Sequence, residues 1–512
     1  MSDHTAGALD VGTNRAAGGL ARRAIALVDD HPWRVFSAFA FVHLVVWTLS
    51  PRLLFPNLPL DLIEALTYGR EWQLGHDKLP PLPWWTVEIL YRLFHDDIAY
   101  YAFSQLTIVA AFALVFRLAL KLTDARAAIA AVLIVDGLHY FTSTSPKFNH
   151  DVIQLPFWAL AGVSFYYALR TQRLAHWILL GIALGGAFWA KYFVAMLAVP
   201  LALFVLIDRD ARTSLRTAGP YVAALIALVI AAPHLWWLVQ NDFLPLRYVE
   251  MRAEPPRGFY DHGWRPLQFV IGQAFWLLPS LAIAANLFVR RRDNARYDVD
   301  AFSFRIITLL TFGPCALLLV TSAISGGKLI SMWGYPLWLF LGLWLMLRIG
   351  PITEPKRLVG LGWTWAAVTA IYLIAFVIFM AIDPRLRVTY RAELFPGAAV
   401  AHDLAARFRS ETGQPVAYVI GPMYFGGNVS HYAAEAPRTV IDGDLRRVPW
   451  IDPADLKRRG ALVVWVERDP NRVPDEYRSL TGNAAPREPL KFPAIWGKWV
   501  ATVGWTIVPP RP

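Results

Sequence analysis

The stretch VFSAFAFVHLVVWTLSPR (residues 35–52) is the first of eleven apolar stretches that approach the length of a membrane span. A helix needs about 20 mainly apolar residues to cross the hydrocarbon core of a bilayer. The other ten stretches lie near residues 98–119, 127–143, 152–169, 176–193, 194–208, 219–239, 267–289, 304–323, 329–348 and 358–382. The pattern predicts a mainly α, polytopic bundle of about eleven spans, within a range of 11–13.

The composition agrees with a membrane protein. Of the 512 residues, 56% are hydrophobic and 17% are charged, whereas soluble domains are about 25% charged. The single Cys315 excludes an intrachain disulfide and a cysteine metal cluster. The net charge of +11 resides at span ends and in short connections, without the folded basic patch that a nucleic-acid partner requires.

Basic residues also predict the sidedness of the spans. They concentrate in five connections, at residues 117–126, 170–173, 209–216, 290–296 and 348–357. Cytoplasmic loops carry an excess of Lys and Arg, so we expect these connections in the cytoplasm together with an N-terminal segment of residues 1–34. That segment lacks the features of a cleavable signal peptide. Residues 35–382 then form a transmembrane domain, with outer loops at 53–97 and 240–266.

After the last span the chain changes character. Residues 383–512 are more charged and rich in proline, with strand-like runs at 416–420, 462–466 and 499–507 and a helical stretch near 398–410. These features predict a small α/β domain of about 130 residues, placed outside by the same alternation of spans.

The segment DLIEALTYGREW (residues 61–72) follows the first span and is unusually rich in ionisable residues. If it is helical, Asp61, Glu64, Tyr68 and Glu71 share one polar face. A carboxylate face at a membrane surface suggests chemistry at that surface, and a solvated loop helix is the plain alternative. Residues 82–95 form an amphipathic segment that we expect to lie in the interface.

Three further outer clusters could carry chemistry. Asp151 lies at the start of an apolar run. It either takes part in a reaction or stabilises a helix N-terminus through the helix dipole. Lys191 lies between two apolar runs and either contacts a lipid-linked phosphate or extends toward headgroups. The loop after the span near 219–239 contains His234 and Arg247. Arginine suits a phosphate or a sugar carboxylate, and a solvated basic loop is the alternative.

These motifs, taken in order, resemble those of a known enzyme family. They are PLDLIEA (59–65), GREWQLG (69–75), KLPPL (78–82), NHD (149–151), AKY (190–192), PHLWW (233–237) and Lys328–Pro336. The set is similar to the bacterial branch of the dolichyl-phosphate-mannose-protein mannosyltransferase-like family, glycosyltransferase family 39, which is related to the lipid A aminoarabinose transferases. The resemblance covers about residues 30–350 and implies the C-type glycosyltransferase fold.

The resemblance implies roles for particular residues. Asp61 corresponds to the catalytic base, and Asp151 corresponds to a second catalytic carboxylate, at the start of a later span. Lys78 and Lys191 correspond to phosphate contacts. Further substrate-binding positions are Glu64, Tyr68, His234, Arg247 and Lys328. The family often has two adjacent acids and a Lys-Pro-Pro turn, whereas here Leu62 follows Asp61 and Leu79 follows Lys78. The role of Glu64 therefore stays open.

The implied activity is transfer of a hexosyl or pentosyl group, with inversion, from a polyprenyl-phosphate-linked donor to an acceptor. The acceptor is lipid A, core glycan, another lipid or a protein, at the outer face of the inner membrane, with the C-terminal domain in the periplasm. No nucleotide-binding loop appears. No cofactor is required and no metal site is expected, although a divalent cation is compatible with converging phosphate and carboxylates. We expect a monomer.

A transporter or flippase of a lipid-linked or anionic solute is the alternative. Transporters commonly show internal repeats and charged residues at mid-span. This chain shows no repeat, and its candidate charges, apart from Asp136, lie at outer span ends. Cleavage of the donor, rather than its intact movement, distinguishes the transferase.

Overall fold

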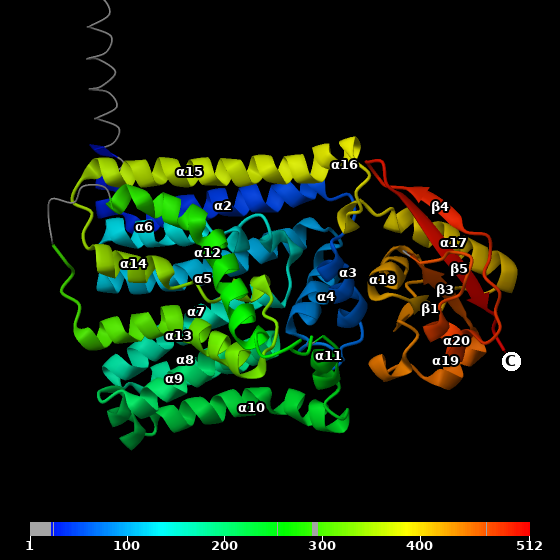
Figure 1. Cartoon of the computed structure of the whole chain (residues 1–512), viewed down its shortest axis with the longest axis horizontal. Coiled ribbons are helices and arrows are strands. Elements are labelled where there is room, and N and C mark those ends of the chain that lie inside the picture. Colours follow the sequence, from blue (N-terminus) through cyan, green and yellow to red (C-terminus); the bar gives the residue numbers. More distant parts are fainter. Residues whose placement is uncertain (1–21, 24, 253, 289–294, 467, 512) are drawn as a thin grey trace, which may run out of the picture.

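The computed structural model describes residues 22–511 except 24, 253, 289–294 and 467. It consists of a bundle of long helices with an α/β domain at one end (Figure 1). The predicted fold class, a mainly α polytopic bundle followed by a small C-terminal α/β domain, is confirmed. Most of the predicted cytoplasmic segment 1–34 lies outside the described residues.

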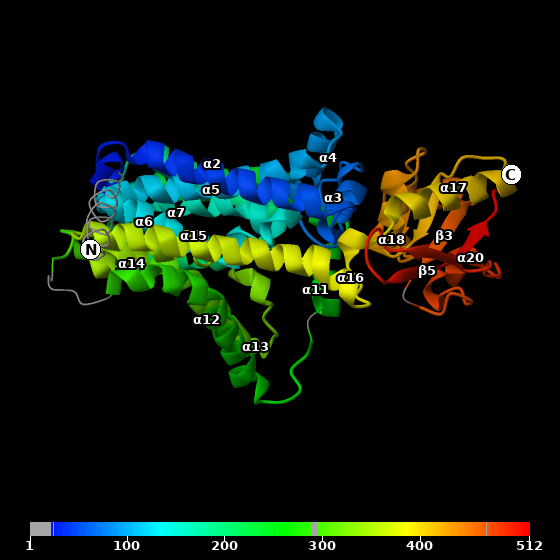
Figure 2. The ribbon, with the colours of Figure 1, turned by 90° about the horizontal axis from the view of Figure 1, so that it is seen from above.

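Seven of the described helices are long and apolar enough to cross a membrane. They are α2 (Pro32–Leu54), α5 (Ile98–Leu122), α7 (His150–Thr171), α10 (Gly219–Gln240), α12 (Asp261–Phe288), α13 (Ala301–Ser325) and α15 (Pro355–Val377), which continues through the π-helical η6 (Ile378–Ile382) into α16 (Asp383–Leu386). In the view of Figure 2, α12 and α13 slope away from the other helices.

The remaining predicted stretches form shorter or broken helices. Helix α6 (Ala125–Asp136) and the turns η1 (His139–Phe141) and η2 (Ser145–Lys147) make a pair bent by 85°. The other elements here are α8 (Leu174–Ala190), η3 (Tyr192–Val194), α9 (Ala195–Ile207), η4 (Ala211–Arg216), η5 (Ser331–Gly334) and α14 (Leu341–Ile349). Each predicted stretch thus contains helix, but several are not one continuous span.

The two ends of the bundle differ in charge and in what covers them. Helices α3 (Leu60–Gly69), α4 (Leu82–Phe94) and α11 (Leu244–Arg252) lie at the end next to the C-terminal domain (Figure 1). The basic connections 117–126, 170–173 and 209–216 lie at the opposite end. The connection 290–296 lies largely outside the described residues. The predicted sidedness requires this segregation, and the orientation in the membrane stays a prediction.

The expected polar face of residues 61–71 is wrong in two respects. Helix α3 ends at Gly69, so Glu71 is not on it. Glu64 and Tyr68 are buried rather than solvated, because α3 packs between α4 and the C-terminal domain. Gly69 permits the close approach to α4: a Cβ there would lie 2.3 Å from the Trp84 carbonyl oxygen.

The C-terminal domain contains a five-stranded sheet of order β2-β1-β3-β5-β4. Strands β2 (Arg438–Ile441), β1 (Tyr418–Gly421) and β3 (Ala461–Trp465) are parallel, while β5 (Val500–Val508) is antiparallel to β3 and to β4 (Leu490–Pro493). The helical elements are η7 (Ala392–Leu394), α17 (Gly397–Thr412), α18 (Met423–Tyr432), η8 (Leu445–Arg447), α19 (Pro453–Arg459), η9 (Asp475–Tyr477) and α20 (Arg478–Thr481). The three predicted strand runs correspond to β1, β3 and β5, and the predicted helix corresponds to α17.

Buried polar contacts fix this domain to the bundle. The Asn57 amide donates to the Tyr424 hydroxyl (2.8 Å) and to Asn428 Oδ1 (3.1 Å), and all three side chains are buried. Arg70, just after α3, donates to the Ser430 hydroxyl at 2.7 Å. Helix α18 therefore packs directly on the segment that contains Asp61.

Candidate active site

The N-terminus of α7 meets α3 through one side chain. Asn149 is the N-cap of α7, and its Oδ1 accepts hydrogen bonds from the backbone N–H groups of Asp151 (2.9 Å) and Val152 (3.3 Å). Its Nδ2 donates to Asp61 Oδ2 at 2.9 Å. The cap that satisfies the helix end thus also orients the Asp61 carboxylate, which is partly exposed.

Asp151 and Lys191 form one ion pair at this end of the bundle. Lys191 ends α8 with an extended backbone, and its Nζ lies 2.6 Å from Asp151 Oδ1. Gln154 Nε2 donates to the same oxygen at 3.1 Å. Both charged side chains are about nine-tenths buried, and such charges are stable there only when paired and hydrogen-bonded.

Glu64 and Lys78 form a second pair. Lys78 Nζ lies 2.5 Å from Glu64 Oε2, and the Tyr248 ring of α11 lies 5.5 Å from the same nitrogen. Burial alone would lower the pKa of Lys78, but the Glu64 carboxylate outweighs it and raises that pKa to about 12. Lys78 is therefore a permanent cation at neutral pH.

Tyr68 lies beneath these pairs. It is fully buried, and its hydroxyl donates to Asp77, which also accepts from Arg447 Nε at 2.6 Å. Burial, reinforced by Asp77, holds the pKa of Tyr68 well above its usual value. A fully buried, neutral phenol cannot touch a substrate in this conformation, so the structure gives Tyr68 a supporting position rather than the expected contact.

His234 is also buried, and its segment is not the loop we expected. Residues 233–240 continue α10, and the imidazole donates from Nδ1 to the Leu74 carbonyl (2.5 Å). Its Nε2 accepts from the Tyr192 hydroxyl at 2.7 Å. Because both ring nitrogens are engaged, His234 ties the segment before Lys78 to the end of α8 and offers no free nitrogen to a substrate.

The last two predicted contacts lie apart from the pairs. Lys328 is exposed and bonded to Glu254 at 2.8 Å, so the structure does not bring it to Asp61. Arg247 is exposed on α11 and lines a cavity against the C-terminal domain. The structure therefore assembles Asp61, Glu64, Lys78, Asp151 and Lys191 and leaves the other predicted residues around or outside them.

Three residues at the site were not among those expected. Asn149 was detectable, because an Asn before an acid and an apolar run is a typical N-cap. Asp77 adjoins Lys78, but nothing in the local sequence indicates that it is buried. Arg447 is 370 positions away from its partner Asp77, so only the tertiary fold reveals it.

The described residues contain no group of three or more His, Cys, Asp or Glu side chains arranged to hold a metal ion. Glu64 and Asp151 are instead bonded to lysines. The cations at the site are thus lysine side chains, each bonded to a carboxylate.

Comparison with known proteins identifies part of the chain. Residues 78–237 match the sequence model of the family described as dolichyl-phosphate-mannose-protein mannosyltransferase. The matched range includes Lys78, Asn149, Asp151 and Lys191. This segment, less than half of the chain, is similar to that family. The family resemblance found from the motifs is confirmed.

Two curated relatives come from Rhizobium johnstonii. The lipid A galacturonosyltransferase RgtD is 25% identical over 198 residues, which are 37% of this chain and 40% of the relative. The lipopolysaccharide core galacturonosyltransferase RgtB is 24% identical over 358 residues, covering 66% of this chain and 69% of the relative. The alignment with the first relative thus spans well under two thirds of its length.

Solved structures share the fold at low identity. ArnT from Cupriavidus metallidurans bound to undecaprenyl phosphate aligns with a TM-score of 0.60 and 15% identity, covering 92% of this chain and 98% of that one. The mycobacterial arabinofuranosyltransferase AftD aligns with a TM-score of 0.51 and 15% identity, covering 93% of this chain and 40% of that one. The segment that matches the family model therefore lies within an ArnT-like fold.

Proposed function

We propose that this protein is an inner-membrane glycosyltransferase that moves a sugar from a polyprenyl phosphate to lipid A or the lipopolysaccharide core. The family segment and the names of the two curated relatives support the reaction and the acceptor class. The undecaprenyl phosphate in the ArnT structure supports the donor class. Because those relatives are galacturonosyltransferases, a hexuronic acid is the sugar we favour.

The observation that carries this proposal is the contrast among three carboxylates. Glu64 and Asp151 are each bonded to a lysine, whereas Asp61 takes part in no ion pair within the described part of the chain. One Asp61 oxygen accepts from Asn149, and a carboxylate has further lone pairs available for a proton. Asp61 is therefore the general base of the proposal.

The proposed reaction uses these charges in one step. The acceptor hydroxyl oxygen attacks the anomeric carbon while Asp61 takes its proton, and the bond from that carbon to the phosphate oxygen breaks. The phosphate leaves with the electron pair, and the configuration inverts. Lys78 and Lys191 stabilise the negative charge on the leaving phosphate, and Glu64 and Asp151 orient those lysines. A positioned base contributes about 10²–10⁴-fold.

Membrane orientation, oligomeric state and metal content complete the proposal. The site lies at the end of the bundle opposite the basic connections, which supports placement at the periplasmic face with the N-terminus in the cytoplasm. The protein acts as a monomer. The proposal includes no resident metal: Lys78 and Lys191 would contact the phosphate, and a divalent cation carried by the donor phosphate is compatible with the same site.

The test is release of polyprenyl phosphate from a short-chain polyprenyl-phosphate sugar by the purified, reconstituted protein. Asp61→Asn should reduce release about 10²–10⁴-fold. Asp403→Asn, which removes a carboxylate of α17 bonded to Arg407, is the matched control and should leave the rate unchanged. Equal rates for Asp61→Asn and wild type would refute the base assignment. Movement of the intact donor across the vesicle membrane without cleavage would favour the alternative function as a transporter.

A further inference from the structure

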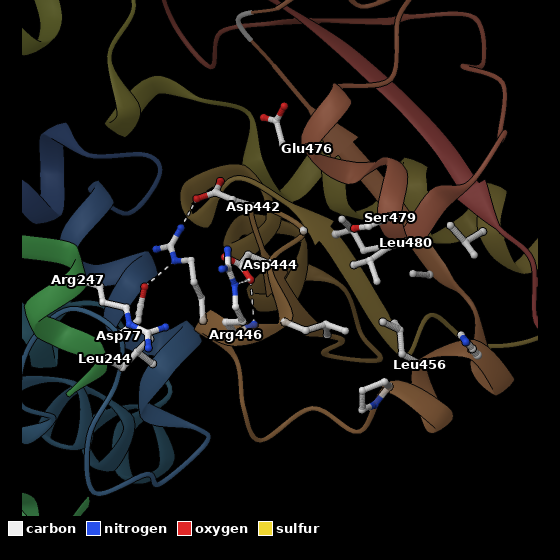
Figure 3. Close-up of a pocket in the computed structure, with 18 of the residues that line it drawn as sticks. Asp77, Leu244, Arg247, Asp442, Asp444, Arg446, Leu456, Glu476, Ser479 and Leu480 are labelled. Atoms are coloured by element: carbon white, nitrogen blue, oxygen red, sulfur yellow. Dashed lines mark hydrogen bonds and ion pairs between the residues drawn. The ribbon is translucent and has the colours of Figure 1, made fainter. Parts of the chain in front are cut away.

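A cavity of about 1150 Å³ lies between the bundle and the C-terminal domain. Asp77, Leu244 and Arg247 line it on the bundle side, and Arg446 and Leu456 are among its residues on the domain side (Figure 3). Ligand cavities usually measure about 300–1,000 Å³, so this one has room for more than a single sugar ring.

The cavity adjoins the proposed reaction centre. Its wall includes Asp77, which directly precedes Lys78, and Tyr248, whose ring faces the Lys78 ammonium at 5.5 Å. A molecule held in the cavity would therefore contact the residues that surround Lys78. The C-terminal domain supplies most of the lining, and it lies beyond the ends of the bundle helices (Figure 1).

Most charged groups of the lining are already compensated. Arg447 is bonded to Asp77 and Asp442, and Arg446 is bonded to Asp444. Figure 3 labels the three carboxylates and draws these bonds as dashed lines. By contrast, Arg247 of the bundle and Lys457 of the domain form no ion pair with any described residue. The lining as a whole contains four cations and four carboxylates, and Glu476 is bonded to Arg468 outside it. Arg247 and Lys457, one from each side, are therefore the two lining cations available to an anionic ligand.

Apart from Ser479, Tyr248 and Glu476, the rest of the wall is apolar. Leu244, Ile420, Leu456 and Leu480 provide surface for the flat faces of sugar rings, while the arginines and carboxylates can bond hydroxyl groups. A polyprenyl chain would instead need an uninterrupted apolar path in contact with lipid. The lining therefore fits a saccharide with an acidic group better than the lipid part of the donor.

We propose that this cavity binds the anionic saccharide head group of the acceptor, with Arg247 and Lys457 as its charge-recognising residues. This inference rests on the proposed function and specifies its acceptor site. The C-terminal domain then acts as part of the substrate-binding machinery, and it holds the acceptor so that a hydroxyl reaches Asp61.

Titration calorimetry on the full-length protein in nanodiscs tests this assignment. The probes are three water-soluble disaccharides: a bis-phosphorylated glucosamine disaccharide, its unphosphorylated form, and a hexuronic-acid-containing disaccharide. We expect at least one anionic probe to bind more tightly than the neutral one. A preference for phosphate indicates a lipid A-type acceptor, and a preference for carboxylate indicates core glycan.

The variant Arg247→Gln/Lys457→Gln should weaken anionic binding about tenfold or more, equivalent to about 1.4 kcal/mol. It should raise the acceptor KM with little change in donor KM. Lys491→Gln, an exposed position on β4 outside the cavity, is the matched control. Equal affinity for charged and neutral probes, or an unchanged Kd in the double variant, would overturn the assignment. Specific anionic binding without polyprenyl phosphate release would contradict the proposed function and leave the cavity assignment intact.

Discussion

The N-terminal end of α7 and the junction with the C-terminal domain differ in whether their carboxylates are bonded to cations. At α7, Asp61 keeps a carboxylate outside any ion pair in the described structure, oriented by the neutral Asn149. At the junction, Asp77 and Glu71 are buried and bonded to Arg447 and Arg438 of the domain. The first arrangement leaves a group available for proton transfer, and the second uses charge to hold two parts of the chain together.

This difference divides the acidic residues by role. A base must be able to gain a proton, so a cation bonded to it would oppose its function. A buried structural carboxylate must be bonded to a cation, because an unpaired charge there is costly. Glu64 and Asp151 fall between the two classes, since each is bonded to a lysine of the proposed reaction centre.

Removing Lys78 should reduce catalysis more than breaking the junction or replacing Glu64. Lys78→Met eliminates a cation for the leaving phosphate and leaves Glu64 buried without its partner, so kcat should fall about 10²–10³-fold. Steady-state kinetics of donor cleavage measure this. Lys328→Met, at an exposed lysine bonded to Glu254, is the control and should change kcat less than about twofold. Similar losses in both variants would contradict the distinction between site and surface lysines.

Breaking the junction should have an intermediate effect. In Arg447→Gln, the buried Asp77 carboxylate keeps the hydrogen bond from the Tyr68 hydroxyl and has a neutral glutamine amide in place of the guanidinium. The free energy of unfolding should therefore fall by about 3 kcal/mol. Because Asp77 directly precedes Lys78, the same change should displace Lys78 and lower kcat about tenfold. Thermal unfolding and kinetics on the same preparations measure both effects.

Arg472→Gln provides the matched control, because Arg472 is exposed, lies outside the cavity lining and forms a surface bond to Asp475 that should contribute little to stability. The double variant Asp77→Asn/Arg447→Gln should lose less than the sum of the single variants, since the two residues share one interaction. Additive losses of stability would show that Arg447 does not act through its bond to Asp77.

The sequence was sufficient for the parts of the site that depend on local pattern. Apolar run length predicted the bundle, and the motifs around Asp61, Lys78, Asp151 and Lys191 identified groups that the fold assembles. It was insufficient where the environment depends on distant segments. Burial of Tyr68 and His234 follows from packing against α4, the C-terminal domain and residue 74. The short strand β2, which provides the Arg438 partner of Glu71, had no alternating pattern long enough to recognise.

The smallest expected effect is a change in pH dependence at the Glu64–Lys78 pair. Glu64 raises the pKa of Lys78 from 10.5 to about 12. With Glu64 ionised, the contribution of Lys78 to stability through this pair is therefore complete below about pH 10.5 and is lost as the pH rises through about 12. Wild-type activity should accordingly show no loss from Lys78 deprotonation up to about pH 10.

In Glu64→Gln the carboxylate is absent and burial then lowers the pKa of Lys78, because desolvation disfavours the ammonium. The alkaline limb of kcat should move to lower pH, while kcat at neutral pH changes less than in Lys78→Met. Rate profiles from pH 6 to about 10.5 for wild type and Glu64→Gln measure the shift. Superimposable alkaline limbs would show that Glu64 does not control the charge of Lys78.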